Sequence, residues 1–463
     1  MLWVEYWKKR GIPLSNQKLK DRDLVAAVIE AARLKKVDSA EAFFNMEEEL
    51  TIEVRNGEVE NLKVARDEGF GIRVIQGERM GFAYSTGLTR DDVQVTLDAA
   101  LANAQVASAD PYYQLPEPVK TYPKLDLDDP HLQEVTLEEK IEMARQLERS
   151  GRSFDPLVQL TEAATYTEVS YQTAIANTNG VLLASNGAFC GGAAAFVAGK
   201  DGELQTGFEL DYARKIAELD PQAIGREAAR KAVQMIGSQV LPTKRVPVVI
   251  DPFVVISFLG MLASAMTAEA VQKGRSLFSG RVGERVASSG VNIIDDGALH
   301  DGVLSAPFDG EGVPTQSTTL IDNGVLQGFL YNSYTGAKDG VPSTGNAVRG
   351  SFQSPPQNGS TNFYLAPGSR TPEDIIRETN EGFYLNEVMG MHTANPISGD
   401  FSLGAAGIWI ENGELTKPVR GMVIAGNILE LLERVDAVGS DLRFFVSKGA
   451  PTIRVANLTV SGQ

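Results

Sequence analysis

A strand followed by an apolar helix decides the fold: Val246-Pro-Val-Val-Ile-Asp-Pro-Phe-Val-Val-Ile-Ser-Phe-Leu-Gly-Met-Leu-Ala-Ser-Ala-Met266. Its first five residues have the apolar, β-branched composition of a buried strand. Asp251 can cap the free amide groups of a helix and Pro252 fits the first turn, so a helix begins there. Phe253–Met266 is apolar on nearly all sides, and its length and serines suit a core helix better than a membrane span.

The segment just downstream carries a family resemblance. Ser276-Leu-Phe-Ser-Gly-Arg-Val-Gly-Glu-Arg-Val-Ala-Ser288 resembles the TldD/TldE (PmbA) family, in which a helix shortly upstream carries His-Glu-x-x-x-His. Aligned without gaps, that motif falls on Leu259, Gly260 and Ser264. None of these side chains can bind zinc or act as a general base. The resemblance therefore implies degenerate catalytic positions and no metal site in this chain.

Histidine and cysteine usage agrees with that interpretation. The chain has three histidines, far apart in sequence, and one cysteine, Cys190. Catalytic zinc usually takes three protein ligands, and no two of these histidines can lie one helical turn apart. The TldD-type subunits also use a cysteine near the C terminus as a zinc ligand, and none follows Cys190 here. Cys190, beside Phe189 and Gly191, is expected to be a small buried residue.

The tract Met389–Glu414 resembles the TldE-type signature, with Gly399-Asp-Phe-Ser402 among its recognisable parts. One interpretation is a groove for an extended peptide, because glycines allow a backbone to approach and small polar groups can bond it. The candidate peptide contacts are His392, Asn395, Ser398 and Asp400. The alternative is that Asn395-Pro396 and Ser398-Gly399-Asp400 only form tight turns, with His392 making a surface contact.

Three further segments have a plain structural explanation. Asp295-Asp296-Gly297 is typical of a turn, and Asp309-Gly310-Glu311-Gly312 is typical of a loop, which leaves little reason for a carboxylate metal site. Gly345–Gly359, which contains Arg349, lacks phosphate-loop spacing. It is either a mobile flap over a cleft or a long surface loop.

The pattern of elements predicts an α+β protein with three parts. Residues 1–110 form an N-terminal α+β module, and residues 111–240 hold a proline-rich linker and a second α+β module. Residues 241–463 form a β-rich barrel or sandwich that carries the degenerate helix. In each of the first two parts a helix precedes several antiparallel strands and a second helix follows them.

Local signals place several caps, turns and short strands. Thr89 is expected to cap one helix, and Thr136 with Glu139 forms a capping box for another. Ala40–Asn45 and Leu50–Arg55 are expected as separate short strands. The expected turns are Asn56-Gly57, Asn179-Gly180, Asn186-Gly187 and Lys200-Asp201-Gly202.

Charge and composition exclude several classes of partner. The net charge of −17 opposes binding to nucleic acid, whose affinity comes largely from neutralised phosphates. No membrane interaction is expected, and Met1–Arg10 lacks the apolar run of a signal peptide. A single cysteine gives no disulfide framework, which favours the cytoplasm.

The resemblance implies a subunit of a TldD/TldE-type zinc metallopeptidase complex that degrades or processes small or unfolded peptides. In such a complex a TldD-type partner supplies the zinc and the general base, and this chain, without those residues, is non-catalytic. The alternative is a stand-alone homodimer that binds peptides or acts as a scaffold without peptidase activity. A hydrolase with an Asp- or Ser-based site ranks last, because no Gly-x-Ser-x-Gly nucleophile elbow occurs.

Overall fold

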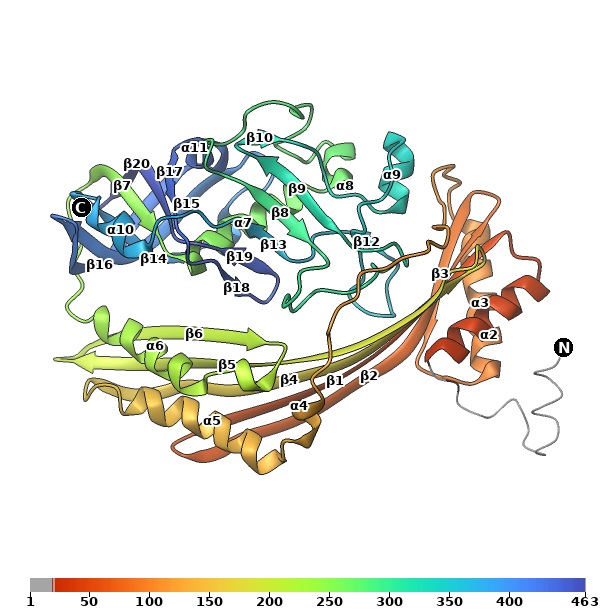
Figure 1. The fold of residues 1–463 in the computed structure, drawn as a ribbon, viewed down its shortest axis with the longest axis horizontal. Coiled ribbons are helices and arrows are strands. Elements are labelled where there is room, and N and C mark those ends of the chain that lie inside the picture. Colours follow the sequence, from red (N-terminus) through yellow and green to blue (C-terminus); the bar gives the residue numbers. More distant parts are fainter. Residues whose placement is uncertain (1–18, 20, 463) are drawn as a thin grey trace.

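A long antiparallel sheet and a separate C-terminal domain make up the molecule (Figure 1). The computed structural model describes Leu19 and residues 21–462, so Met1–Arg10 lies outside the described residues. The C-terminal domain lies over one face of the sheet, and the helices of the first two modules lie on the other face. Within the described residues, no helix combines the length and the apolar composition needed to cross a membrane.

Six strands of the described chain form the sheet, and both N-terminal modules contribute three of them. In spatial order they are β3 (Arg79–Ser85), β2 (Glu58–Gln76), β1 (Ser39–Arg55), β4 (Val158–Asn177), β5 (Leu182–Lys200) and β6 (Glu203–Ala213). The helices that cover it are α2 (Asp21–Leu34), α3 (Arg90–Val106), α4 (Pro130–Glu134), α5 (Leu137–Arg152) and α6 (Pro221–Gln234).

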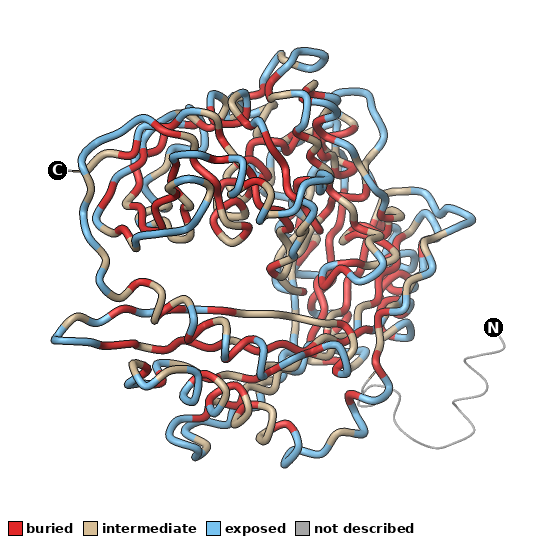
Figure 2. Tube along the Cα trace, turned by 60° about the vertical axis from the view of Figure 1, so that its left-hand side comes forward, coloured by how far each residue is buried: buried red, intermediate tan, exposed pale blue. Residues whose placement is uncertain are grey.

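The two faces of the sheet follow from alternation along each strand. In β1, Ala42 and Phe44 are buried against α2 and α3, whereas Glu41 and Phe43 point to the C-terminal domain. Because successive side chains point to opposite faces, one strand serves both layers. Buried residues follow the sheet where it meets its helices and fill the C-terminal domain (Figure 2).

The strands are longer than expected, and the expected breaks in them are wrong. β1 runs without interruption through Glu47–Glu49, and every residue there pairs with β2 and β4. Asn186-Gly187 is not a turn but lies within β5, opposite Gln172 and Tyr171 of β4. Polar residues interrupt the apolar pattern in these strands because part of the sheet is not covered by another layer.

Several local signals are confirmed. Thr89 Oγ1 accepts a hydrogen bond from the Asp92 amide, and Thr136 Oγ1 accepts one from the Glu139 amide, each within a capping box. The Asn56-Gly57 turn has φ of 54° and 78°. This is the left-handed backbone that a tight hairpin requires.

The two halves of the sheet share one packing detail. A Cβ atom on Gly81 of β3 would lie 2.1 Å from the Ala100 carbonyl oxygen of α3. A Cβ atom on Gly207 of β6 would lie 2.2 Å from the Ala228 carbonyl oxygen of α6. In each half, a glycine on the outer strand therefore lets the second helix of that half approach the sheet closely. The backbone of a further alanine, one helical turn on, also lies close to each glycine: Ala104 to Gly81 and Ala232 to Gly207.

A closed five-stranded barrel forms one part of the C-terminal domain. Its strands are β7 (Lys244–Ile250), β14 (Glu381–Met389), β15 (Asp400–Glu411), β16 (Glu414–Asn427) and β20 (Ile453–Ser461). The pairing of β16 with β20 closes it, and β17 (Val435–Val438) extends it beside β20. One pair, β14 with β7, is parallel. The expected β-rich domain is confirmed.

A second sheet packs beside the barrel, with the apolar helix α7 (Pro252–Ala265) contacting both. This sheet runs β10 (Val325–Leu326), β9 (Ser317–Asp322), β8 (Ile293–Asp296), β13 (Phe363–Leu365), β19 (Lys448–Ala450) and β18 (Arg443–Phe445). The remaining elements are α8 (Ala268–Gln272), α9 (Ser333–Asp339), α10 (Pro372–Arg377), α11 (Ile428–Glu433) and the hairpin of β11 (Ala347–Val348) and β12 (Gln357–Asn358). Contacts on both sides explain why α7 is apolar nearly all round.

Candidate functional site

The helix α7 begins where the sequence predicts. Asp251 accepts a hydrogen bond from the Phe253 amide at 2.9 Å, and Pro252 occupies the first turn. The Tyr384 hydroxyl donates to the other Asp251 oxygen at 2.6 Å. Since Tyr384 lies on β14, this bond ties the start of the helix to the barrel.

The three degenerate positions do not share one environment. Leu259 is 2% exposed and belongs to the hydrophobic core. Gly260 and Ser264 instead line a cavity of about 280 Å³, together with Ala263 and Thr267. Gly260, Ala263 and Ser264 share one face of α7, because they lie three and four positions apart. Thr267, the N-cap of α8, continues this wall beyond the end of α7.

The opposite wall of this cavity consists of Asn358, Gly359, Ser360 and Lys448. The Lys448 ammonium donates hydrogen bonds to the Ser360 hydroxyl at 3.1 Å and to the Ser447 hydroxyl at 3.4 Å. Burial lowers the pKa of Lys448, and the nearby Asp295 partly opposes that shift. We name this space the α7 cavity.

The α7 cavity offers space but no ligands for a transition metal. A Cβ atom on Gly260 would meet nothing within 4 Å. The residues that line the cavity include no histidine, cysteine or carboxylate. Their hydroxyl, amide and ammonium groups can donate hydrogen bonds, and the single charge among them is positive.

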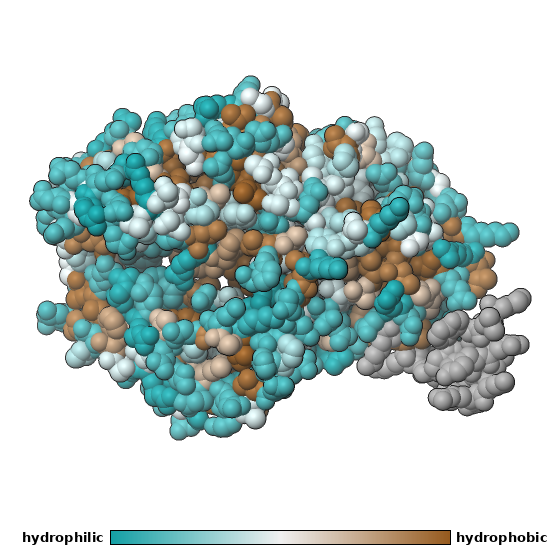
Figure 3. All heavy atoms as spheres, in the orientation of Figure 1, coloured by the Kyte–Doolittle hydropathy of each residue, from teal (hydrophilic) through white to brown (hydrophobic). Residues whose placement is uncertain are grey.

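A larger cavity of about 400 Å³ lies between the sheet and the C-terminal domain. Ser360 lines both cavities, so the two adjoin at this residue. Figure 3 shows the molecule hollowed between the C-terminal domain and the β4–β6 part of the sheet. We name this second space the interdomain cavity.

The walls of the interdomain cavity differ in chemistry. The sheet contributes aromatic and acidic side chains, among them Phe43, Tyr171, Phe189 and Glu47. Burial, together with Glu49 and Asp67, raises the pKa of Glu47. The C-terminal domain contributes a mostly apolar segment, residues 303–306, and the polar Ser360 and Thr361. A ligand there would meet flat apolar faces and isolated polar groups, as in most small-molecule and peptide sites.

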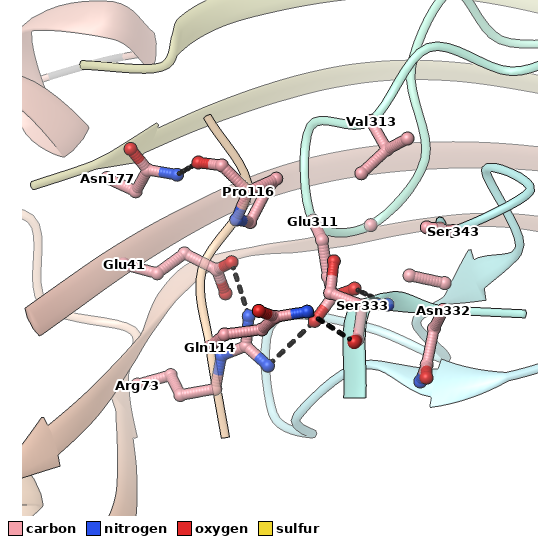
Figure 4. A network of polar contacts seen from close by, with 12 residues as sticks. Glu41, Arg73, Gln114, Pro116, Asn177, Glu311, Val313, Asn332, Ser333 and Ser343 are labelled. Carbon is pink, nitrogen blue, oxygen red and sulfur yellow. Dashed lines mark hydrogen bonds and ion pairs between the residues drawn. The ribbon is translucent and has the colours of Figure 1, made fainter. Parts of the chain in front are cut away.

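A buried ion-pair network joins the two layers beside this cavity. Arg73 of β2 donates to Glu41 at 2.7 Å and to Glu311 at 2.9 Å, and the other Glu41 oxygen accepts from Arg349. Glu311 also accepts from the Ser333 amide at 2.9 Å (Figure 4). Two carboxylates and two guanidinium groups balance each other, which offsets the cost of burying each.

The expectation for Asp295 is wrong, and the one for Asp309 and Glu311 is right about the loop. Asp295 is not part of a turn but lies in β8, where it is 1% exposed and accepts from Asn346 and Thr361. The segment around Asp309 and Glu311 is a loop, as expected, but both side chains are buried. Burial and Glu311 raise the pKa of Asp309 to about 7, although it accepts three backbone amide bonds.

The segment Gly345–Gly359 is neither a flap nor a surface loop. It forms the β11–β12 hairpin, and Phe352 at its tip is fully buried. A Cβ atom on Gly69 would lie 2.4 Å from the Phe352 ring, so the sheet admits this ring only because glycine is there. The hairpin anchors the C-terminal domain, and Arg349 is part of that anchor.

The predicted groove residues lie on an exposed loop between β14 and β15. Asn395, Ser398 and Asp400 come together in one turn, in which the Asn395 side chain accepts from the Ser398 amide and the Ser398 hydroxyl donates to Asp400. Asn427 donates to Asp400 at 2.9 Å. None of these residues lines the α7 or the interdomain cavity. The bonds themselves are those of the tight-turn alternative.

The two remaining residues that the sequence singled out, His392 and Cys190, lie outside both cavities. His392 is exposed, in a short 3-10 turn at Met391–Thr393. Cys190 is fully buried in β5, as predicted, and burial raises the pKa of its thiol to about 12.

The sequence did not point to three residues of the site, because no motif marks them: Lys448, Arg73 and Glu41. For Glu41 and Arg73 the available signal was a charged residue inside an otherwise apolar stretch of a strand, whereas the short segment Lys448–Ala450 carries no such signal.

Comparisons with known proteins agree along the chain. Residues 40–104, 130–236 and 243–462 match family models described as PmbA/TldA metallopeptidase domain 1, central domain and C-terminal domain. Metalloprotease PmbA of Escherichia coli O157:H7 is 28% identical over 430 residues, 92% of this chain and 93% of that protein. A metalloprotease of Methanothermobacter thermautotrophicus is 30% identical over 452 residues, 89% of this chain and 93% of that protein.

The fold agrees as well. The crystal structure of TldE from Thermococcus kodakarensis is 25% identical and superposes with a TM-score of 0.87, covering 94% of this chain and 100% of that chain. The resemblance of the segments at 276–288 and 389–414 to the TldD/TldE (PmbA) family is confirmed by these matches. The chain is a member of the PmbA/TldD metallopeptidase family.

Proposed function

We propose that this chain is the non-catalytic, TldE/PmbA-type subunit of a cytoplasmic peptidase complex, with a TldD-type subunit as its partner. The observation that supports this most directly is the α7 cavity. The helix face at the family's motif carries Gly260, Ala263 and Ser264, and Lys448 faces it. The substrates would be small or unfolded peptides, and the chain would help to enclose and position them.

The residues of the α7 cavity do not fit the zinc ion that the family name implies. A catalytic zinc site needs nitrogen, sulfur or carboxylate ligands and one open position. Here the donor set consists of hydroxyl and amide groups, and an ammonium group would repel a divalent cation. In our proposal, therefore, no chemical step of peptide hydrolysis takes place in this chain.

The role left to this chain is binding. An extended peptide can lie against apolar and aromatic walls while its main chain bonds to polar groups. The interdomain cavity provides both kinds of surface, with Tyr171 and Phe189 on one side and Ser360 and Thr361 on the other. Folded proteins would be too large to enter a space of about 400 Å³.

The isolated chain is expected to retain no stoichiometric zinc after dialysis, because neither the α7 cavity nor any group of three His, Cys, Asp or Glu side chains in the described part of the chain is arranged to hold a metal ion. Elemental analysis of the purified protein is the measurement. A TldD-type homologue with an intact His-Glu-x-x-x-His motif, treated in parallel, is the control. About one zinc ion per chain after dialysis would contradict the proposal.

A TldD-type partner from the same host is expected to co-purify with this chain and to confer peptide hydrolysis on the complex. Affinity purification from the native host, followed by mass spectrometry and a peptide-cleavage assay, tests it. Metal analysis of each separated subunit should then place the zinc in the partner. Recovery of a homodimer without peptidase activity, with a TldD-type protein expressed in the same cells, would favour the stand-alone binding protein instead.

A further inference from the structure

The Lys448 ammonium in the α7 cavity has no carboxylate partner. Its side chain crosses beside the Phe363 ring, with Nζ 5.7 Å from the ring centre, and ends at the Ser360 and Ser447 hydroxyls. Within the described part of the chain, no carboxylate oxygen comes within 4 Å of this half-buried ammonium, whereas the buried Lys140 and the half-buried Lys231 each pair with a glutamate.

The nearby carboxylate of Asp295 accepts its hydrogen bonds from other residues. Asp295 accepts from the Asn346 side chain at 2.7 Å, from the Thr361 amide at 2.7 Å and from the Thr361 hydroxyl at 2.9 Å. These bonds hold its oxygens away from Lys448. Partial burial costs the Lys448 ammonium some of its hydration, and the two serine hydroxyls replace only part of that hydration. An anion bound in the cavity would remove that cost.

The cavity around Lys448 suits a small carboxylate attached to a peptide. The Ser360 hydroxyl, which accepts from Lys448, and the second N–H of the Asn358 side-chain amide can donate hydrogen bonds without adding charge. The Ser264 and Thr267 hydroxyls already donate to the carbonyls of Gly260 and Ser264. The open space above Gly260 leaves room for a backbone to lie close to α7. Through Ser360 the α7 cavity adjoins the larger interdomain cavity, which can hold the rest of a ligand.

We propose that the α7 cavity binds the C-terminal carboxylate of a short peptide, with Lys448 as its counterion. This assignment rests on the proposed peptide-binding function and adds which way round the peptide lies in the two cavities. The peptide would enter with its C terminus at Lys448 and its preceding residues along the interdomain cavity. A fixed ammonium group then stands beside the helix where a catalytic relative would carry its metal ligands.

The test compares two forms of one peptide on the full chain. N-acetyl-Ala-Ala-Ala as the free acid and as the C-terminal amide differ only in the terminal charge, and isothermal titration calorimetry measures both affinities. Because a hydrogen bond to a charged group is worth about 1.5–3 kcal/mol, the amide is expected to bind roughly ten- to a hundredfold more weakly. Lys448→Met should weaken binding of the acid by a similar factor and leave the amide unchanged.

Two controls make the result specific. Lys200→Met changes an exposed lysine at the end of β5, and it should alter neither affinity. Sodium acetate, titrated alone, separates a peptide site from a general anion site. If Lys448→Met fails to fold, the comparison of acid and amide on the unchanged protein still decides the question.

Several outcomes would overturn the inference. Equal affinity for acid and amide would refute the role of Lys448 while leaving the peptide-binding function intact. Binding of neither form would refute both. Acetate binding as tight as that of the peptide acid would refute the peptide assignment. Cleavage of the peptide by this chain alone would refute a purely binding role.

Discussion

Glu41→Ala is expected to lower the free energy of unfolding by about 3–5 kcal/mol, the range for breaking a buried ion pair from one side. Glu41 is fully buried and its two oxygens accept from Arg73 and Arg349. Without it, two guanidinium groups face one remaining carboxylate, Glu311, in a site closed to water. Urea denaturation followed by far-UV circular dichroism measures the loss.

A glutamate on the same strand gives a matched control. Glu48 pairs with Arg66 at 3.6 Å, but its side chain is 46% exposed, so Glu48→Ala should cost about 1 kcal/mol or less. The double variant Glu41→Met with Arg73→Met keeps the network neutral, and it is expected to lose less than the sum of the two single losses. Equal stability of Glu41→Ala and the unchanged protein would mean that this network does not hold the two layers together.

Arg214→Ala is expected to destabilise the protein by about 3 kcal/mol or more, because it leaves several buried carbonyl groups unbonded at once. Arg214 follows β6, is 2% exposed, and donates to the carbonyls of Gly302, Val303 and Ser305 in the C-terminal domain. It also donates to Ala188 on β5. The segment that it holds, residues 303–305, lines the interdomain cavity.

The loss of stability in Arg214→Ala should be greatest near the segment that Arg214 holds. Hydrogen exchange of the amides in residues 299–306 is expected to accelerate in Arg214→Ala before the rest of the C-terminal domain responds. Arg214→Lys should rescue little, since one ammonium group cannot reach carbonyls that a planar guanidinium spans. Arg226→Ala, which removes an exposed arginine that donates to Gln222 at 3.4 Å, should leave stability and exchange unchanged. Unaltered exchange in Arg214→Ala would contradict this role.

Features that depend on a few neighbouring residues could be predicted from the sequence. Helices begin as expected at Asp251 with Pro252 and at Thr136 with Glu139, and the chain forms the expected tight turn at Asn56-Gly57. In each case the chemistry that decides the structure lies within one turn of the chain. Strand length was not predictable in this way. The polar run Glu47–Glu49 stays in β1 because β2 and β4 pair with it, and that pairing is not visible in β1 itself.

The candidate site was predictable in part. The degenerate helix was found through a resemblance, and the structure adds that Gly260 and Ser264 face a cavity whereas Leu259 does not. Lys448 was not found, since its significance arises from facing α7 across that cavity, nearly two hundred positions away in sequence. The same reason applies to Glu41 and Arg349, whose meeting depends on how the C-terminal domain lies on the sheet.

The matching contacts of Gly81 and Gly207 show that the two halves of the sheet are built alike. Each half of the sheet is a helix, three strands and a second helix, and the halves meet where β1 pairs with β4. One such half alone would expose a long strand edge, which readily pairs with another copy. The sheet therefore joins two similarly built units edge to edge, so that neither leaves its β1 or β4 edge unpaired. The two units then serve different ends, because one supplies Arg73 to the C-terminal domain and the other supplies Arg214.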